Sequence, residues 1–183
     1  MSIIQQMPKL KNSLIGTFLF LALLSCKKTQ KNIFSEHGVS FTIPEGWVIT
    51  QSESLNDTLG FFLTCEKKGM NESGMFTLSW INQEVSKEEF LLLLKKQLSQ
   101  NSFYKNTGIL FNEIQPIKNL GHFQVSSTGF ITQLSGLKHS GKIVCFNCNG
   151  RTLGLIFQTA QEDEEKNNTG FEEIQKSFVC NLP

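Results

Sequence analysis

Arginine is almost absent from this chain of 183 residues, in which Arg151 is the single example. A site that holds phosphate through clustered guanidinium groups is therefore excluded. An excess of charge of one sign is also missing, because 17 lysine and arginine residues stand against 16 aspartates and glutamates. Nucleic-acid-binding proteins carry a clear basic excess, so we expect no nucleic acid among the partners.

The short motifs that mark common catalytic sites are missing as well. The sequence contains no G-x-S-x-G, H-E-x-x-H or G-x-x-x-x-G-K-[ST] pattern, and this excludes the local signatures of serine hydrolases, zinc proteases and P-loop proteins. His37, His122 and His139 are scattered along the chain, and we predict that His122 and His139 lie on the surface. We therefore expect no enzyme, no catalytic residue, no metal and no cofactor.

The N-terminus has the features of an export signal. Lys9 and Lys11 precede an apolar run from Leu14 to Leu24. This run has the length of a signal-peptide core and is shorter than the ~20 residues that cross a bilayer as a helix. We predict that residues 1–25 form a signal peptide.

The end of this apolar run, Leu23-Leu24-Ser25-Cys26, is similar to the lipobox of bacterial lipoproteins. At a lipobox, a peptidase cuts before a cysteine whose thiolate has taken up diacylglycerol. The similarity implies that Cys26 is lipidated and that acyl chains such as palmitate hold the exported protein in the cell membrane or the outer membrane. The alternatives are an ordinary secretory signal with an incidental Cys26, or a membrane-anchored helix.

We expect residues 26–32 to form the lipidated N-terminus and a short polar tether, and residues 33–183 to form one α+β domain. Ser86 and Glu89 form a capping box before an apolar helical stripe, and Thr169 and Glu172 form a second one. Polar loops are predicted over 51–59, 99–108 and 161–168. Alternating or apolar runs predict strands at 39–43, from 47, and at 60–66, 75–81, 109–115, 121–134, 138–148 and 151–160.

Asn149-Gly150 is a strong signal for a two-residue type I′ hairpin. A turn at this place pairs Phe146 with Leu153 and Val144 with Leu155. Both faces of this hairpin are apolar, so we predict that both are covered. The sequential hairpins favour a single antiparallel sheet flanked by helices.

The segment from Gly38 to Trp47 (GVSFTIPEGW) resembles the opening strand, turn and strand of PsbP-like α/β/α sandwiches, a group that includes the DcrB-type bacterial lipoproteins. The order of the later elements is similar too, so the resemblance extends over about residues 33–179. It implies a non-enzymatic accessory or chaperone-like module. Pro44 and Trp47 match as structural positions only.

Four cysteines remain beyond Cys26: Cys65, Cys145, Cys148 and Cys180. An oxidising compartment favours one or two disulfides, although Cys65 and Cys145 can also be buried free thiols. Residues i and i+3 of a strand lie about 10 Å apart, which makes a Cys145–Cys148 bond the least favoured. Cys180 can bond to Cys65 or Cys148. No helix follows this C-x-x-C pair and no second pair accompanies it, so it predicts neither a redox site nor a zinc site.

Three functions remain open from the sequence. The first is a lipid-anchored module of the cell envelope that binds or scaffolds a protein partner. The second is a carrier or receptor for a small apolar ligand, which the apolar residues on both sheet faces suggest. The third is an enzyme with dispersed catalytic residues.

The lipobox yields a direct test. Cys26→Ala removes the thiol that accepts the lipid, so we expect labelling with a palmitate analogue to be lost and a full-length precursor to accumulate in the membrane. Metabolic labelling and the migration of the precursor measure both effects. Normal labelling of the variant would contradict lipidation at Cys26.

Overall fold

The structure, a computed structural model, describes residues 32–70, 72–112 and 119–181. The predicted signal peptide, the lipobox with Cys26, and residues 27–31 of the tether lie outside the described residues, as does Pro116.

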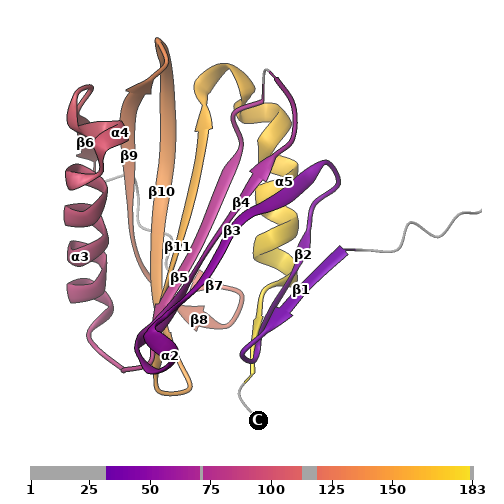
Figure 1. Cartoon of the computed structure of the whole chain (residues 1–183), viewed down its shortest axis with the longest axis vertical. Helices are drawn as coiled ribbons and strands as arrows, with labels where there is room; N and C mark the ends of the chain where they lie inside the picture. The colour runs from indigo at the N-terminus through magenta and orange to yellow at the C-terminus, as the bar shows by residue number, and fades with distance from the viewer. Residues whose placement is uncertain (1–31, 71, 113–118, 182–183) are drawn as a thin grey trace, which may run out of the picture. The chain divides into compact units, whose positions relative to one another are not determined.

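Seven antiparallel strands form the main sheet of the domain (Figure 1), in the order β3-β4-β5-β11-β10-β9-β6. The strands are β3 (Trp47–Leu55), β4 (Gly60–Lys67), β5 (Met75–Ile81), β6 (Ile109–Asn112), β9 (Ser126–Leu134), β10 (Leu137–Cys148) and β11 (Arg151–Ala160). This agrees with the predicted α+β class.

The prediction of one sheet is wrong, because the described chain forms three. β1 (Asn32–Glu36), β2 (Val39–Ile43) and β12 (Val179–Cys180) form a second sheet, and β7 (Asn119–Leu120) pairs with β8 (Phe123–Gln124) in a small ribbon. The turn after Pro44 separates β2 from the main sheet. Folded back in this way, β2 buries Phe41 against Phe76, with ring centroids 5.2 Å apart.

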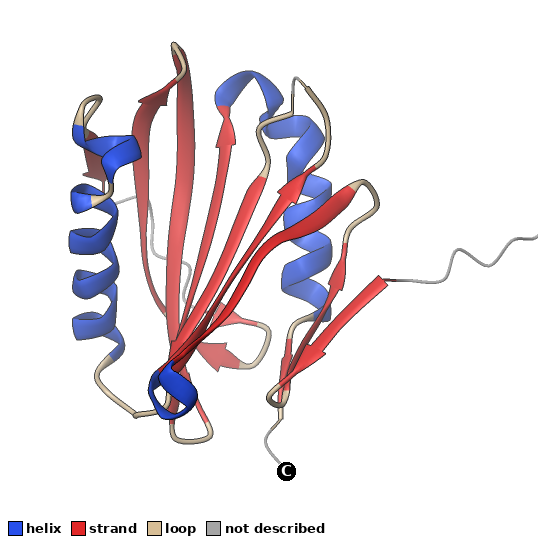
Figure 2. Ribbon diagram, viewed as in Figure 1, coloured by secondary structure: helices blue, strands red, loops and turns tan. Residues whose placement is uncertain are grey.

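Helices cover both faces of the main sheet (Figure 2). α3 (Lys87–Gln100) packs on β9, β10 and β11, and the one-turn helix α4 (Ser102–Lys105) follows it. α5 (Glu164–Ser177) packs on β11 and β2 across the opposite face, and a short helix η2 (Gln161–Asp163) precedes it. α2 (Asn56–Leu59) is a single turn between β3 and β4. None of the helices in the described ranges is long and apolar enough to cross a membrane.

The hairpin of β10 and β11 has the predicted register. Asn149 and Gly150 both adopt positive φ, at 52° and 77°, as a type I′ turn requires. Phe146 pairs with Leu153 and Val144 with Leu155. Two separate cores confirm that both faces are covered. Val144 and Phe146 lie in the core beneath α5 and β2, whereas Ile143, Cys145 and Ile156 lie in the core beneath α3.

Several predicted boundaries were wrong. Residues 51–55 continue β3 as an exposed edge strand, and α4 interrupts the predicted loop at 99–108. Residues 161–168 form η2 and the first turn of α5, and Asp163 and Asn167 in this segment are buried. Since α5 starts at Glu164, the prediction of a second capping box at Thr169 is also wrong.

The first predicted capping position is confirmed. Ser86 caps α3, because its Oγ accepts a hydrogen bond from the N–H of Glu89.

Trp47 anchors α5 to the sheet. Its indole lies between Gly74 and Gly170, and a Cβ atom on either glycine would come within about 3 Å of the ring. The ring also meets Phe171 of α5 edge-on, at 5.4 Å between centroids. The two glycines therefore allow the close approach of helix and strand.

His139 was predicted to lie on the surface and is instead 7% exposed, whereas His37 and His122 are exposed. Burial lowers the pKa of His139 below its usual value of 6.5, and the carboxylates of Asp163 and Glu162 oppose part of this effect. The folded protein therefore favours the neutral imidazole, while the unfolded chain takes up a proton near pH 6.5. The stability that this group contributes is complete above that pH and is lost as the pH falls through it.

We predict that the free energy of unfolding decreases from about pH 7 to about pH 5.5, with a slope of at most about 1.4 kcal/mol per pH unit for this group. His139→Gln should flatten the dependence, and the exposed control His122→Gln should keep it. Denaturant titrations at each pH measure the slope. Equal slopes in the two variants would contradict the assignment to His139.

Candidate functional site

A groove follows one side of α5. It consists of two open hollows, of about 430 Å³ and about 470 Å³, that share Glu172 and Gln175 of the helix. The floor of the first hollow comes from β10 and β11, and the second hollow lies between α5 and the β7–β8 ribbon. We call the two hollows together the α5 groove.

Residues of α5 that share one face of the helix form the wall of the groove. Glu164, Asn168, Glu172 and Gln175 follow one another at steps of four, four and three residues, which places them on one face of α5. This face carries both carboxylates and amides. It can therefore accept hydrogen bonds along its whole length and donate them from Asn168 and Gln175.

Lys142 of β10 stands on the floor of the first hollow. Its Nζ lies 5.9 Å from the ring centroid of Phe157, and burial of the amine lowers its pKa. Within the described residues, no carboxylate lies close enough to Lys142 to form an ion pair. A partly buried amine without an ion-pair partner is stabilised by a ligand oxygen that accepts a hydrogen bond from it, because this bond compensates for the desolvation of the amine.

An ion pair marks the junction of the two hollows. Lys176 Nζ lies 2.6 Å from a carboxylate oxygen of Glu172, one helical turn away. The hydrogen bond from Lys176 lowers the pKa of Glu172. Both side chains are exposed, so the pair adds little to stability and both groups remain accessible from the groove.

A polar network fixes the N-terminal end of α5. Ser73 Oγ donates to Asp163 at 2.8 Å and accepts from the N–H of Ala160 at 2.9 Å. Asn167 Nδ2 donates to Thr159 at 2.7 Å. The hydrogen bonds from Ser73 and then Lys166 lower the pKa of Asp163. A carboxylate of lowered pKa is a weak base, so this serine is held in place and is not activated as a nucleophile.

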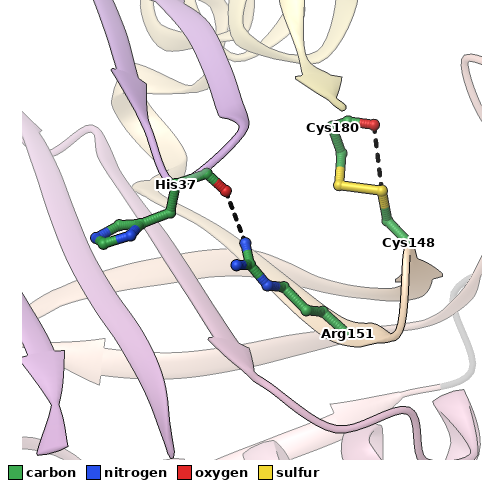
Figure 3. The surroundings of a disulfide bond; sticks show 4 residues. All are labelled: His37, Cys148, Arg151 and Cys180. Atoms are coloured by element: carbon green, nitrogen blue, oxygen red, sulfur yellow. Dashed lines mark hydrogen bonds between the residues drawn. A yellow bond between two sulfur atoms is a disulfide. The ribbon is translucent and has the colours of Figure 1, made fainter. Parts of the chain in front are cut away.

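A disulfide closes the end of the domain where β10 meets β12 (Figure 3). Cys148 and Cys180 are bonded across 32 residues. In the loop-entropy model, closing a loop of this length stabilises the fold by roughly 3–4 kcal/mol. Beside it, Arg151 donates a 2.7 Å hydrogen bond to the carbonyl of His37, and its guanidinium lies 5.4 Å from the ring centroid of Trp80. Arg151 therefore connects the turn between β10 and β11 to the turn between β1 and β2, and its guanidinium has a structural role.

The structure separates the cysteines into two groups. Cys180 is bonded to Cys148, and Cys145 is not, since its side chain points into the core beneath α3. Cys65 and Cys145 are free and buried, and burial raises the pKa of each thiol to about 12. Both therefore behave as small apolar side chains. The lipobox residues Leu23 to Cys26 lie outside the described residues.

The acidic residues show no metal site. In the part of the chain that the structure describes, no group of three or more His, Cys, Asp or Glu side chains could hold a metal ion. Glu162 to Glu165 lie in η2 and the first turn of α5 and not in a solvated loop. Glu88 accepts hydrogen bonds from Ser126 and Ser86 near the start of α3, and these lower its pKa to about 2.

Sequence reasoning missed the α5 groove. A signal for its floor was present, because the register of the Asn149-Gly150 hairpin puts Lys142 on the same face as Val144 and Phe146. A lysine on an apolar strand face indicates either an uncovered stretch or a polar partner. The wall could not be found, because residues 161–168 were assigned to a loop.

Comparisons with known proteins show the fold and no more. No protein-family model and no curated protein sequence matches the chain. The domain is similar to LpqN, a protein involved in cell envelope biogenesis of Mycobacterium tuberculosis, with a TM-score of 0.51 and 13% identity over 82% of this chain and 90% of that one. It is also similar to the cyanobacterial PsbP of Synechocystis sp. PCC 6803, with a TM-score of 0.51 and 11% identity over 87% and 99% of the two chains.

A third similar structure is a protein from Bacteroides thetaiotaomicron, with a TM-score of 0.52 and 12% identity over 83% of this chain. The match spans about half of that protein, at 49% of its length. The similarity to cyanobacterial PsbP confirms the resemblance to the PsbP-like fold as a weak one. The resemblance to DcrB-type lipoproteins stays a prediction.

We predict that the two free thiols are protected in the folded protein. A pKa of about 12 leaves almost no thiolate at pH 8, so iodoacetamide should modify Cys65 and Cys145 only after unfolding. Cys148 and Cys180 should stay unmodified until a reductant is added. Peptide mass spectrometry locates the label at each cysteine. Modification of Cys148 in the unfolded, unreduced chain would contradict its bond to Cys180.

Proposed function

We propose that this protein is a non-enzymatic lipoprotein of the bacterial cell envelope that binds an extended segment of a protein partner in the α5 groove. The observation that carries the proposal is the groove itself, with a partly buried amine on its floor and a wall of alternating carboxylates and amides. Cys26 is the proposed site of lipidation, in the inner or the outer membrane.

The chemistry of the groove suits a peptide backbone. A backbone presents carbonyl acceptors and N–H donors in alternation, and the groove offers complementary groups of both kinds. Lys142 and Asn168 donate, while Glu164 and Glu172 accept. A purely anionic ligand would meet these two carboxylates, and a purely apolar one would leave the amine of Lys142 without a partner.

Two further observations support a binding role in the envelope. The export signal and lipobox, if processed, direct the chain there, and LpqN, which shares the fold, is involved in cell envelope biogenesis. The buried polar groups beside the groove are used to hold α5, since Ser73, Asp163 and Asn167 bond to one another or to β11. A network of this kind supports a scaffold better than a reaction centre.

A small apolar ligand is the second candidate. An open hollow of about 520 Å³ lies at the edge of the main sheet, where Ile109, Leu110 and Ile131 contribute apolar side chains. Leu110 is 76% exposed there. A ligand at this place would remain largely in water, and carriers of apolar ligands usually bury most of the ligand surface. The α5 groove is therefore the better supported site.

Site-specific crosslinking in cells tests the proposal. A photo-crosslinking residue replaces Asn168 on the wall of the groove, and the control places it at Thr169, the exposed neighbour that does not line the groove. We expect a defined protein adduct from position 168 and none from position 169. Equal adduct patterns from the two positions would contradict binding in the groove.

Lys142→Met provides a second measurement, because methionine keeps the apolar stem and removes the charge. Loss of one hydrogen bond from a charged donor corresponds to about a tenfold or larger loss of affinity, so the adduct from position 168 should fall by at least about that factor. Lys96→Met on the exposed face of α3 is the matched control and should leave the adduct unchanged. An unchanged adduct in Lys142→Met would remove Lys142 from the site.

A further inference from the structure

The sheet face that forms the floor of the α5 groove continues beyond the groove. Ser140 and Lys142 of β10 line the first hollow and point to the same face, because they are two residues apart on one strand. Ser140 pairs with Ile131 of β9, and Ile131 pairs with Leu110 of β6. Directly paired residues of neighbouring strands lie on one face of a sheet. These three residues therefore form a row across three strands, on the same face as Lys142.

The described helices leave the outer part of this face open. α5 packs on β2 and β11, whereas α3 packs on the opposite face, where Ile143 and Cys145 are buried. Figure 1 shows β9 and β6 beyond β10, on the side away from α5. Leu110 and Ile131 line the open hollow of about 520 Å³ at the edge of the sheet, and Leu110 is largely exposed there. The two aliphatic side chains therefore form an uncovered apolar surface next to the groove.

The charge of this outer face is positive. The strands β6, β9 and β10 contain no acidic residue. Lys138 and Lys142 lie two residues on either side of Ser140, so both point to this face, and neither forms an ion pair with a carboxylate of the described residues. Lys138 is exposed and remains hydrated, whereas Lys142 is half-buried. A ligand carboxylate therefore stabilises Lys142 more than Lys138.

Sheet geometry sets the distance between the amine and the aliphatic pair. Leu110 lies two strands away from Lys142 and is displaced from it by two residues along the strands. With about 4.8 Å between strands and about 3.3 Å per residue, the two Cα atoms are about 12 Å apart. In an extended peptide, side chains i and i+4 point the same way and lie about 13 Å apart. One peptide can therefore place a carboxylate at Lys142 and an aliphatic side chain at Leu110.

We propose that the partner segment bound in the α5 groove carries an acidic residue and, four positions away, an aliphatic residue, which contact Lys142 and the Leu110–Ile131 pair. This assignment rests on the proposed function, since it names the chemistry of the segment that the groove binds. The segment leaves the groove at Ser140 and crosses β9 toward β6. Glu164 and Glu172 on the wall then accept hydrogen bonds from backbone N–H groups of the segment.

Selection from a random peptide library tests this chemistry. The probe is a phage library of random dodecapeptides, and the full protein, purified in detergent, is the bait. We expect enrichment of peptides in which Asp or Glu stands four residues from Leu, Ile or Val, in either order. A selection that yields no such spacing would contradict the assignment.

Two variants should remove the two preferences separately. Lys142→Met should abolish the preference for the acidic residue and weaken a selected peptide about tenfold or more, because one charged hydrogen bond is lost. Leu110→Ser should abolish the preference for the aliphatic residue and weaken the same peptide about fivefold. Leu92→Ser is the matched control on the outer side of α3, since Leu92 is 62% exposed, against 76% for Leu110, and both preferences should persist in it.

The outcomes separate the two proposals. Peptides that depend on Lys142 but not on Leu110 overturn the aliphatic contact and leave binding in the α5 groove intact. Equal loss of affinity in Leu110→Ser and Leu92→Ser also overturns this contact. Peptides that bind the wild-type protein and both groove variants equally overturn the assignment, and if positions 168 and 169 give equal crosslinked adducts as well, they overturn the proposed function with it.

Discussion

The antiparallel ladder between β10 and β11 is the contact on which the rest of the domain depends. Ten residue pairs run from Cys148 and Arg151 at the turn to His139 and Ala160 at the open end. The ladder lies inside the main sheet and sends apolar side chains to both faces, so each face provides a surface on which a helix can bury its apolar stripe. A shift of one residue in this register would exchange the two faces and remove both cores.

The α5 groove results from the way in which α5 and the β1–β2 hairpin cover one face of the main sheet. α5 and the β1–β2 hairpin bury the face of β4, β5 and β11, with Trp47 bringing the helix close through Gly74 and Gly170. The stretch of β10 around Lys142 is left beside the helix. The close packing that stabilises one part of the sheet thus sets the width and polarity of the groove, and the Ser73–Asp163 network fixes its upper wall.

The sequence predicted correctly those turns, strands and caps whose conformation depends mainly on neighbouring residues. The Asn149-Gly150 turn, the period-two runs and the Ser86 cap are each decided by a few neighbouring residues, and the structure has them where they were expected. The prediction failed at residues 161–168, whose polar composition is typical of a loop. There, contacts from residues distant in sequence, such as Ser73 and Thr159, satisfy the buried Asp163 and Asn167 and allow the helix to start earlier. His139 was misplaced for a similar reason, because β10 lies between β9 and β11 inside the main sheet and the imidazole is buried there.

The sequence by itself determined the predicted export route, the α+β class and the register of the central hairpin, because each of these is encoded in residues that lie next to one another. Tertiary structure alone decided that Cys180 bonds to Cys148, that β2 leaves the main sheet, and that Lys142 faces the polar side of α5. These features bring together residues separated by tens of positions. Their geometry is fixed only when the two faces of the sheet are packed, since no local pattern specifies which side chains a helix will cover.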